Sequence, residues 1–187
     1  MILPIVGYGS PVLRTVAKDI DKNYPDLKKL VDDMFETMYK ANGVGLAAPQ
    51  IDLSIRLFVI DASPMKESDP LADGFKRVFI NPQIIEERGD LWSFQEGCLS
   101  LPDIHEEVLR PSIIKIKYFD EDFLEHEEEL DGIRARVFQH EFDHIQGKVF
   151  VDRLSSIRRT LLKRKLNDIS SGRVRTDYKM KTLKKGR

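Results

Sequence analysis

Cysteine is nearly absent from this chain of 187 residues, which contains only Cys98. One cysteine cannot form an internal disulfide, which agrees with a reducing compartment and leaves the thiol to be explained in another way. Long apolar runs are also missing, and a stretch such as 57–60 is far too short to cross a bilayer. The first residues lack the charged start and longer apolar stretch of a secretory signal. These absences predict a cytoplasmic protein with no membrane partner.

Net charge is small as well, at -1, but the charges are divided unevenly along the chain. Residues 153–187 contain 13 Lys or Arg and two Asp, a net charge of +11, so the first 152 residues carry -12. This division suggests an acidic body with a basic C-terminal arm that could bind nucleic acid or an anionic surface. A solvated tail explains the same composition at least as well.

The length fits one domain with its own hydrophobic core. Apolar residues at helical spacing predict a helix over 25–40, which ends at Asn42 and Gly43. A second helix is predicted from 132 or 133 to Gly147, with Asp131 as its N-cap, and a third over 156–169. Short β-rich segments lie between the first two helices, at 55–61, 77–81, 83–88, 111–119 and 123–130. This order predicts a single-domain α+β fold in which antiparallel strands pack around the central helix, followed by a C-terminal helix.

The predicted central helix carries the most specific pattern in the chain, His-Glu-x-x-His at residues 140–144. Two histidines four residues apart project from one face of a helix, so both imidazoles can reach one metal ion, with Glu141 close to a water on that metal. A catalytic metal site needs a third protein ligand and an open position. The candidates include Cys98, His105, His126 and several carboxylates. A lone cysteine is more often a packing residue than a ligand, so the helix alone leaves the third ligand undecided.

Two further motifs bear on the choice of the third ligand. Gly-x-Gly-Leu-Ala-Ala-Pro-Gln occupies residues 43–50, and Glu-Gly-Cys-Leu-Ser occupies 96–100. The helix motif, written in full, is Gln-His-Glu-x-Asp-His at 139–144. In this order and at these spacings, they closely resemble the three signature motifs of the peptide deformylases of bacterial type. The resemblance extends from residue 1 to about 169, so we expect a deformylase-like catalytic domain over 1–169, a basic tail over 170–187, and a monomer.

The resemblance implies that Cys98, His140 and His144 bind a metal ion, which in this family is typically Fe²⁺. The donor set of one thiolate and two imidazoles agrees with this assignment but also suits Zn²⁺, Ni²⁺ or Co²⁺. The implied reaction is hydrolysis of the N-formyl group from the initiator methionine of nascent polypeptides, with release of formate. Glu141 would transfer the proton, while the side chain of Gln50 and the backbone N–H of Leu99 would stabilise the oxyanion.

The same resemblance suggests how a peptide binds. An extended substrate could pair with the backbone of residues Gly43, Val44 and Gly45 as an added strand. Ile133 and Val137, one helical turn apart, would form the pocket for the methionine side chain. Glu96 would orient the site, and Gly97 either permits a close approach or simply makes a turn.

Two positions depart from the family's pattern. His105 stands where many relatives carry an arginine near the substrate backbone, and Arg110 could substitute for that arginine. Arg136 stands where some relatives have an apolar pocket residue. Both departures concern substrate contacts rather than the reaction.

Two other functions fit parts of the same sequence. Zinc peptidases share His-Glu-x-x-His but generally take a third His or Glu downstream, where this chain offers no histidine and Asp152 is the nearest carboxylate. A non-catalytic metal-binding or RNA-binding protein is a further alternative, although a closed structural site needs four protein ligands. If the protein is a deformylase, its basic C-terminal region could bind ribosomal RNA near emerging chains.

Overall fold

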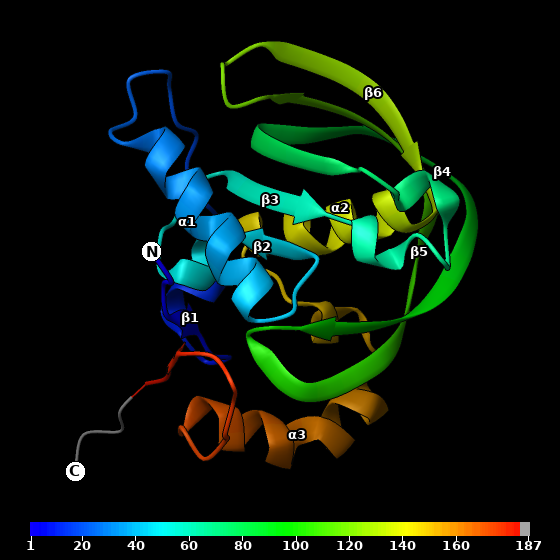
Figure 1. Cartoon of the computed structure of the whole chain (residues 1–187). Helices are drawn as coiled ribbons and strands as arrows, with labels where there is room; N and C mark the ends of the chain where they lie inside the picture. The colour runs from blue at the N-terminus through cyan, green and yellow to red at the C-terminus, as the bar shows by residue number, and fades with distance from the viewer. Residues whose placement is uncertain (184–187) are drawn as a thin grey trace.

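An antiparallel sheet with the strand order β2-β3-β4-β5-β6 forms the framework of the molecule (Figure 1). The computed structural model describes residues 1–183. The strands of this sheet are β2 (Gly45–Ala47), β3 (Leu57–Asp61), β4 (Lys76–Cys98), β5 (Leu101–Phe119) and β6 (Glu125–Asp131). The predicted segments 77–81 and 83–88 are parts of the single strand β4, which continues to Cys98. Register shifts along the β4–β5 pair, the first between Ile80 and Gln83, interrupt the alternation that a straight strand would show in the sequence.

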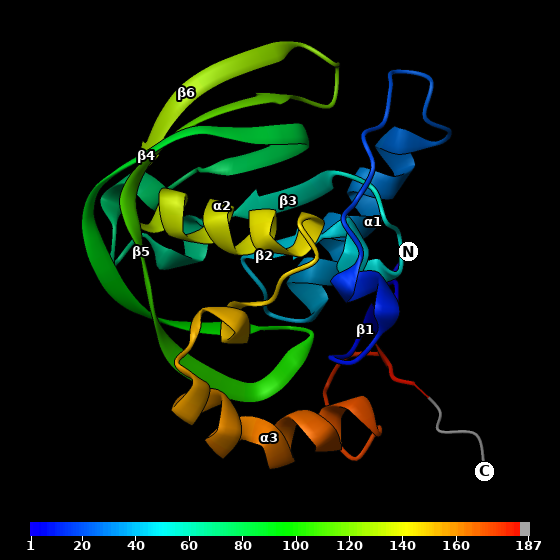
Figure 2. The same ribbon diagram turned by 180° about the vertical axis from the view of Figure 1, so that it is seen from behind.

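The three predicted helices are confirmed as α1 (Leu27–Lys40), α2 (Gly132–Ile145) and α3 (Ser156–Ser170). Helix α2 runs through the middle of the molecule, inside the curve of β4 and β5, as Figure 2 shows from behind. Its Phe138 packs edge-on against Phe58 and Phe79, with ring centroids 5.1 Å and 5.0 Å away. Aromatic pairs at this separation are favourable beyond the area that they bury. This packing fixes the helix that carries the two motif histidines.

The ends of α2 are only partly as predicted. Asp131 occupies the N-cap position, but its side chain accepts no capping hydrogen bond. The carboxylate of Asp69, far away in the sequence, accepts the N–H of Ile133 instead, at 3.0 Å. Gly147 follows the helix with a φ of +71°, the left-handed conformation that favours glycine at this position.

The chain beyond α3 turns back onto the body. Leu162, Leu166 and Ile169 of α3 are buried in a cluster with residues of β5. After Ser170 the chain returns to β1 (Ile5–Val6), where β7 (Met180–Lys181) pairs with it in parallel. The boundary between a catalytic domain ending at 169 and a basic tail stays a prediction, and its residues 184–187 lie outside the described part. None of the helices in the described part is long and apolar enough to cross a membrane.

Candidate metal centre and active site

Three side chains with metal-binding atoms converge between β4 and α2. Cys98 ends β4, while His140 and His144 project from α2, and their ligand atoms all lie within 4.8 Å of one another. The Sγ of Cys98 is 3.3 Å from Nε2 of His144. A thiolate and two imidazoles at this separation fit a divalent first-row metal, and they leave room for the open position of a catalytic site.

Of the remaining candidate ligands, His105 lines the same cavity but does not belong to the cluster. The others lie elsewhere. His126 is on the surface beside Asp120, with 2.6 Å between the ring and the carboxylate. Asp152, the downstream carboxylate that a metallopeptidase would need, accepts hydrogen bonds from Arg14 and from the backbone of Val149. Among the described residues, the histidine pair therefore meets the cysteine and not a downstream acid.

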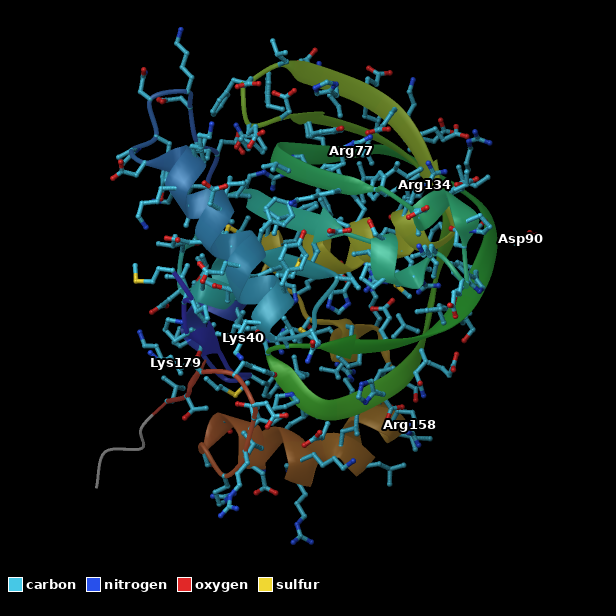
Figure 3. The ribbon with its side chains drawn as sticks, viewed as in Figure 1. Lys40, Arg77, Asp90, Arg134, Arg158 and Lys179 are labelled. Carbon is cyan, nitrogen blue, oxygen red and sulfur yellow. The ribbon has the colours of Figure 1, made fainter. Side chains whose placement is uncertain are left out.

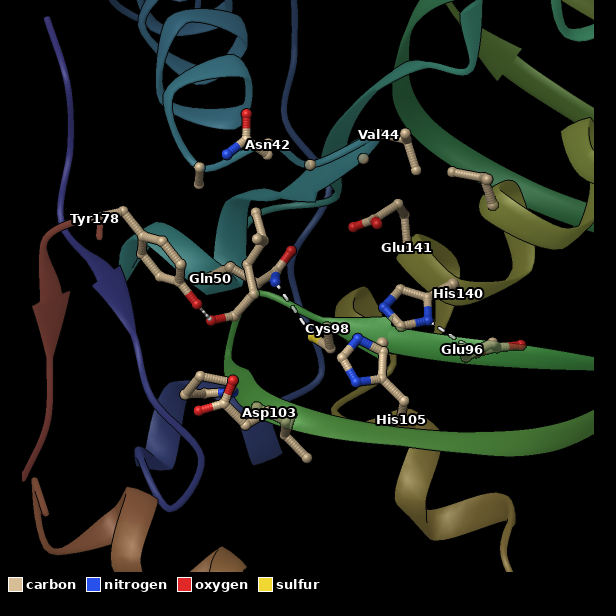
Figure 4. Close-up of a pocket in the computed structure, with 18 of the residues that line it drawn as sticks. Asn42, Val44, Gln50, Glu96, Cys98, Asp103, His105, His140, Glu141 and Tyr178 are labelled. Atoms are coloured by element: carbon tan, nitrogen blue, oxygen red, sulfur yellow. Dashed lines mark hydrogen bonds and ion pairs between the residues drawn. The ribbon is translucent and has the colours of Figure 1, made fainter. Parts of the chain in front are cut away.

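Glu96, two residues before Cys98, fixes the orientation of His140. Its Oε2 is 2.8 Å from Nδ1 of His140, which leaves Nε2 of that ring free to bind a metal (Figure 4). Burial alone would lower the pKa of His140, but the neighbouring Cys98 and Glu96 raise it well above 6.5. Burial lowers the pKa of His144 to about 3, so this imidazole is neutral and ready to act as a ligand.

Glu96 is in turn held by two buried arginines. Arg110, which is 0% exposed, bonds to Glu96 at 2.6 Å and 2.9 Å, and Arg136 bonds to it at 2.9 Å. On its other side, Arg110 donates to Asp143 at 2.8 Å, and Arg153 binds the same carboxylate. Burial tends to raise the pKa of Glu96, but Arg110 and His140 outweigh it and hold that pKa far below its usual range. The carboxylate beside the metal site is therefore ionised and rigidly placed.

Glu141 places a buried, free carboxylate oxygen at the site. Its side chain is buried, its Oε2 has no hydrogen-bond partner among the described residues, and burial raises its pKa to about 7. A Cβ on Gly45 would overlap its Oε1, so the motif needs glycine at that position. A carboxyl group with a pKa near neutrality can both accept and donate a proton during a reaction.

Gln50 and Leu99 lie on the other side of the thiol. The Nε2 of Gln50 is 3.5 Å from Cys98 Sγ and 3.3 Å from Ser100 Oγ, while its Oε1 accepts the backbone N–H of Ala47 at 2.8 Å. This last bond fixes the amide orientation, so that its N–H₂ group is directed toward the site. Leu99 follows Cys98 in the tight connection between β4 and β5.

A cavity of about 510 Å³ opens onto these groups. The backbone of the Gly43, Val44 and Gly45 segment lines one side, and Glu96, Gly97 and Leu99 line another. Val137 of α2 contributes an apolar surface, whereas Ile133 is buried and does not line this cavity. This volume is suited to a small peptide segment rather than a whole domain.

The two departures from the family's pattern have different positions. His105 lines the cavity, and its ring lies so close to Gly97 that a Cβ there would clash with it. Arg110 lies outside the lining, because its guanidinium is committed to Glu96 and Asp143. Arg136 does line the cavity, with its guanidinium 4.8 Å from the centre of the Trp92 ring.

Sequence reasoning missed several cavity residues. Met65 and Phe94 add apolar surface, and residues 175–178 also line the cavity, with Tyr178 on the side opposite His140 (Figure 4). Phe94 lies four residues before Cys98, and this closeness to a candidate ligand is the feature of the sequence that could have identified it. Nothing in the local pattern of Met65 or residues 175–178 indicates that they reach a site formed by distant segments.

Comparison with known proteins agrees with this geometry. A family profile described as polypeptide deformylase matches residues 2–160. The chain is 52% identical to a peptide deformylase of Flavobacterium johnsoniae, with 100% of both chains covered, and 51% identical to one of Christiangramia forsetii, with 97% and 96% covered. It is similar to the crystal structure of a peptide deformylase from Legionella pneumophila, with a TM-score of 0.80 and 38% identity over 94% of this chain and 99% of that one. A Plasmodium falciparum peptide deformylase gives a TM-score of 0.79 and 39% identity over 88% and 94%.

Proposed function

The chain belongs to the peptide deformylase family, and from this premise we infer that it is a metal-dependent hydrolase acting on formylated nascent peptides. The reaction removes the N-formyl group from the initiator methionine and releases formate. The single observation that carries the proposed mechanism is the free carboxylate oxygen of Glu141, buried beside the Cys98, His140 and His144 cluster. An acid in this position suits proton transfer to and from water and the leaving amine.

We propose that Cys98, His140 and His144 hold Fe²⁺, the metal typical of this family, and that Zn²⁺, Ni²⁺ or Co²⁺ can replace it. The donor set supports a divalent first-row metal in general and does not choose among these. When bound, such a metal supplies Lewis acidity, which polarises the formyl oxygen and activates water near neutral pH. Glu96 keeps His140 in the tautomer that this role requires.

Glu141 is the proposed general base and general acid. Its carboxylate takes a proton from the attacking water and delivers it to the departing methionine nitrogen. Gln50 and Leu99 are the proposed oxyanion donors, through the side-chain N–H₂ group and the backbone N–H. The support for Gln50 is its fixed amide, whose Oε1 is already occupied by Ala47. Donors that are held before the reaction starts need no reorganisation as charge develops.

The proposed peptide path lies along the Gly43, Val44 and Gly45 backbone, which offers β-type pairing that reads no side chain. Gly97 also lines the cavity, and its lack of a side chain leaves space for the ring of His105. Val137, Met65 and Phe94 form the proposed pocket for the methionine side chain. The expected role of Ile133 in this pocket is wrong, because Ile133 lies outside the cavity.

The experiment that tests this function starts with anaerobic purification and metal analysis. The protein is then assayed with three peptides: formyl-Met-Ala-Ser, the same peptide without the formyl group, and a longer acetylated peptide with cleavable internal bonds. A deformylase releases formate from the first and leaves the other two intact. Cleavage of internal bonds without formate release would instead establish the metallopeptidase alternative.

A role at the ribosome is proposed separately. Arg159, Lys163, Arg164 and Lys165 are exposed on α3, and none has an ion-pair partner in the described part of the chain. The side chain of Arg158, at the edge of this surface, is held by Glu106 at 2.7 Å (Figure 3). We propose that this surface, with the basic residues that follow it, binds ribosomal RNA phosphates. The proposed setting is a monomer in the cytoplasm, where nascent chains emerge.

A further inference from the structure

The end of the chain reaches the active-site cavity. The C-terminal segment, residues 173–181, lies beyond the 2–160 range that matches the family, yet Arg175, Thr176, Asp177 and Tyr178 line the cavity. Figure 4 shows Tyr178 pointing into the cavity from the side opposite His140. A segment beyond the range of the family profile therefore forms part of the wall of the site.

This segment is firmly attached to the body. The backbone N–H groups of Ile5 and Gly7 donate to Lys179 and Lys181 at 2.8 Å and 2.9 Å. The ammonium of Lys181 also pairs with Asp52 at 2.6 Å. Because these bonds flank Tyr178 on its C-terminal side, they determine where its ring enters the cavity.

The Tyr178 hydroxyl donates a hydrogen bond to the backbone carbonyl of Leu99, at 2.7 Å. Two other bonds hold the next residue: the N–H of Tyr8 donates to the Ser100 carbonyl at 2.8 Å, and Gln50 donates to the Ser100 hydroxyl at 3.3 Å. The connection between β4 and β5 is therefore restrained on both residues that follow Cys98. The bond from Tyr178 is the one that acts directly on Leu99.

From these contacts we propose that Tyr178 is a positioning residue for deformylation, which holds Leu99 so that its backbone N–H is directed at the developing oxyanion. The proposal rests on the proposed function, since Leu99 matters in this way only if its N–H is an oxyanion donor. A donor contributes when it lies at the right distance from the oxyanion before charge develops. Restraining the Leu99 carbonyl limits rotation of the residue whose N–H must keep that position.

The test compares Tyr178→Phe with wild type, using formyl-Met-Ala-Ser and formyl-Met-amide as substrates. The variant keeps the ring in the cavity wall and removes only the hydroxyl. Complete loss of one oxyanion donor lowers kcat by about 10²–10³, so a donor that is loosened but not lost should lower kcat by about three- to tenfold. KM and metal content should stay unchanged, and both substrates should be affected equally.

Tyr39→Phe is the matched control. It removes a phenol hydroxyl that also donates a strong hydrogen bond, to Asp61 at 2.6 Å, but Tyr39 lies outside the cavity lining. Its kcat should equal that of wild type. A kcat of Tyr178→Phe within twofold of wild type would overturn the proposal. Loss of metal from the variant would also overturn it, because Tyr178 would then act through Cys98.

The test separates this proposal from the proposed function. If the wild-type protein released no formate, the proposed function would fail. If wild type and Tyr178→Phe released formate equally fast, only the positioning role of Tyr178 would be excluded.

Discussion

Glu96 and His140 come from different elements, yet the carboxylate of Glu96 lies 2.8 Å from Nδ1 of His140. The same carboxylate is bound by Arg110 and Arg136, so three cationic or proton-bearing side chains converge on one acid. A histidine that binds metal through one nitrogen is usually fixed by a hydrogen bond through the other. The buried charges around Glu96 thus connect the metal site to the core of the protein.

We expect Glu96→Ala to weaken both metal binding and folding. Loss of such a partner typically lowers metal affinity by about 10–100-fold. Arg110 would also remain buried without one of its two carboxylates, and breaking a buried pair in this way costs about 3–5 kcal/mol. Competition with a chelator measures the first effect, and urea unfolding measures the second. Glu87→Ala, an exposed position on the same strand, is the control, and equal behaviour of the two variants would contradict the role of Glu96.

Cys98→Ala should lose metal and activity together. The thiolate is the one anionic ligand in the cluster, and two imidazoles alone hold a divalent ion weakly. With Fe²⁺ bound, the wild-type enzyme should also lose activity in air, because an accessible thiolate is oxidised stepwise. His126→Ala, on the surface beside Asp120, should keep full metal and turnover. Metal content and formate release are measured after anaerobic purification. Full metal occupancy in Cys98→Ala would show that Cys98 is not a ligand.

Glu141→Gln should keep its metal and lose its turnover. The amide cannot accept the proton from water, and general acid–base catalysis usually contributes about 10²–10⁴-fold to the rate. The substitution is nearly isosteric, which preserves the close contact with Gly45. Steady-state kinetics with parallel metal analysis provide the measurement, with the exposed Glu127→Gln as control. A near-normal kcat in Glu141→Gln would mean that another group transfers the proton.

The helices could be predicted from the sequence because their information is local. The apolar spacing of α1 and the glycine after α2 placed their ends within about two residues, and His140 and His144 followed from a spacing of one turn. The course of β4 could not be predicted in this way. Its register shifts break the two-residue alternation, so a continuous strand was interpreted as separate pieces.

The cavity was less predictable than the motifs. Cys98 could be predicted as a metal ligand only from the resemblance across three motifs, because a single cysteine carries no local sequence pattern that identifies a ligand. Met65 and Tyr178 join the cavity through contacts between segments far apart in the sequence, which no local pattern records. The capping of α2 by Asp69 has the same origin, since the two groups are 64 residues apart.

Stability should depend on pH through Tyr39 and Asp61, whose hydrogen bond joins α1 to the end of β3. Burial and this bond raise the pKa of Tyr39 to about 12 from an ordinary value of 10. A group whose pKa is raised by folding contributes fully below its unfolded value, and the contribution is lost as the pH rises through the folded value. Burial alone would raise the pKa of Asp61, but hydrogen bonds from Ser63 and Tyr39 lower it overall. The contribution of Asp61 to stability is therefore lost as the pH falls.

Tyr39→Phe should therefore reduce the alkaline decline in stability. Between pH 10 and 12, the free energy of unfolding should fall less steeply in this variant than in wild type, because its side chain no longer ionises. Urea unfolding at several pH values measures the difference. Tyr24→Phe serves as control, because the Tyr24 hydroxyl makes no hydrogen bond to any described residue. Parallel curves for Tyr39→Phe and wild type would show that the bond to Asp61 does not shift the titration.

The proposed RNA-binding surface is best tested by changing charges on α3 without shortening the chain, because the C-terminal segment also lines the active-site cavity. Substitution of Arg159, Lys163 and Arg164 by Gln should weaken co-sedimentation with ribosomes and make it less sensitive to salt. Contacts to phosphates lose affinity steeply with salt, by about 10³-fold between roughly 50 and 200 mM when six or more phosphates are engaged. Each lost contact should reduce the slope of log affinity against log salt by about one.

A triple variant at Lys22, Lys28 and Lys66 is the matched control, because it removes the same charge from exposed positions outside α3. It should sediment as wild type does, and both triple variants should hydrolyse formyl-Met-Ala-Ser at the wild-type rate, since none of the substituted residues lines the cavity. If the two variants lost the same amount of binding, net charge alone would explain it. A smaller loss in the α3 variant than in the control would place the ribosome contact on another face of the protein.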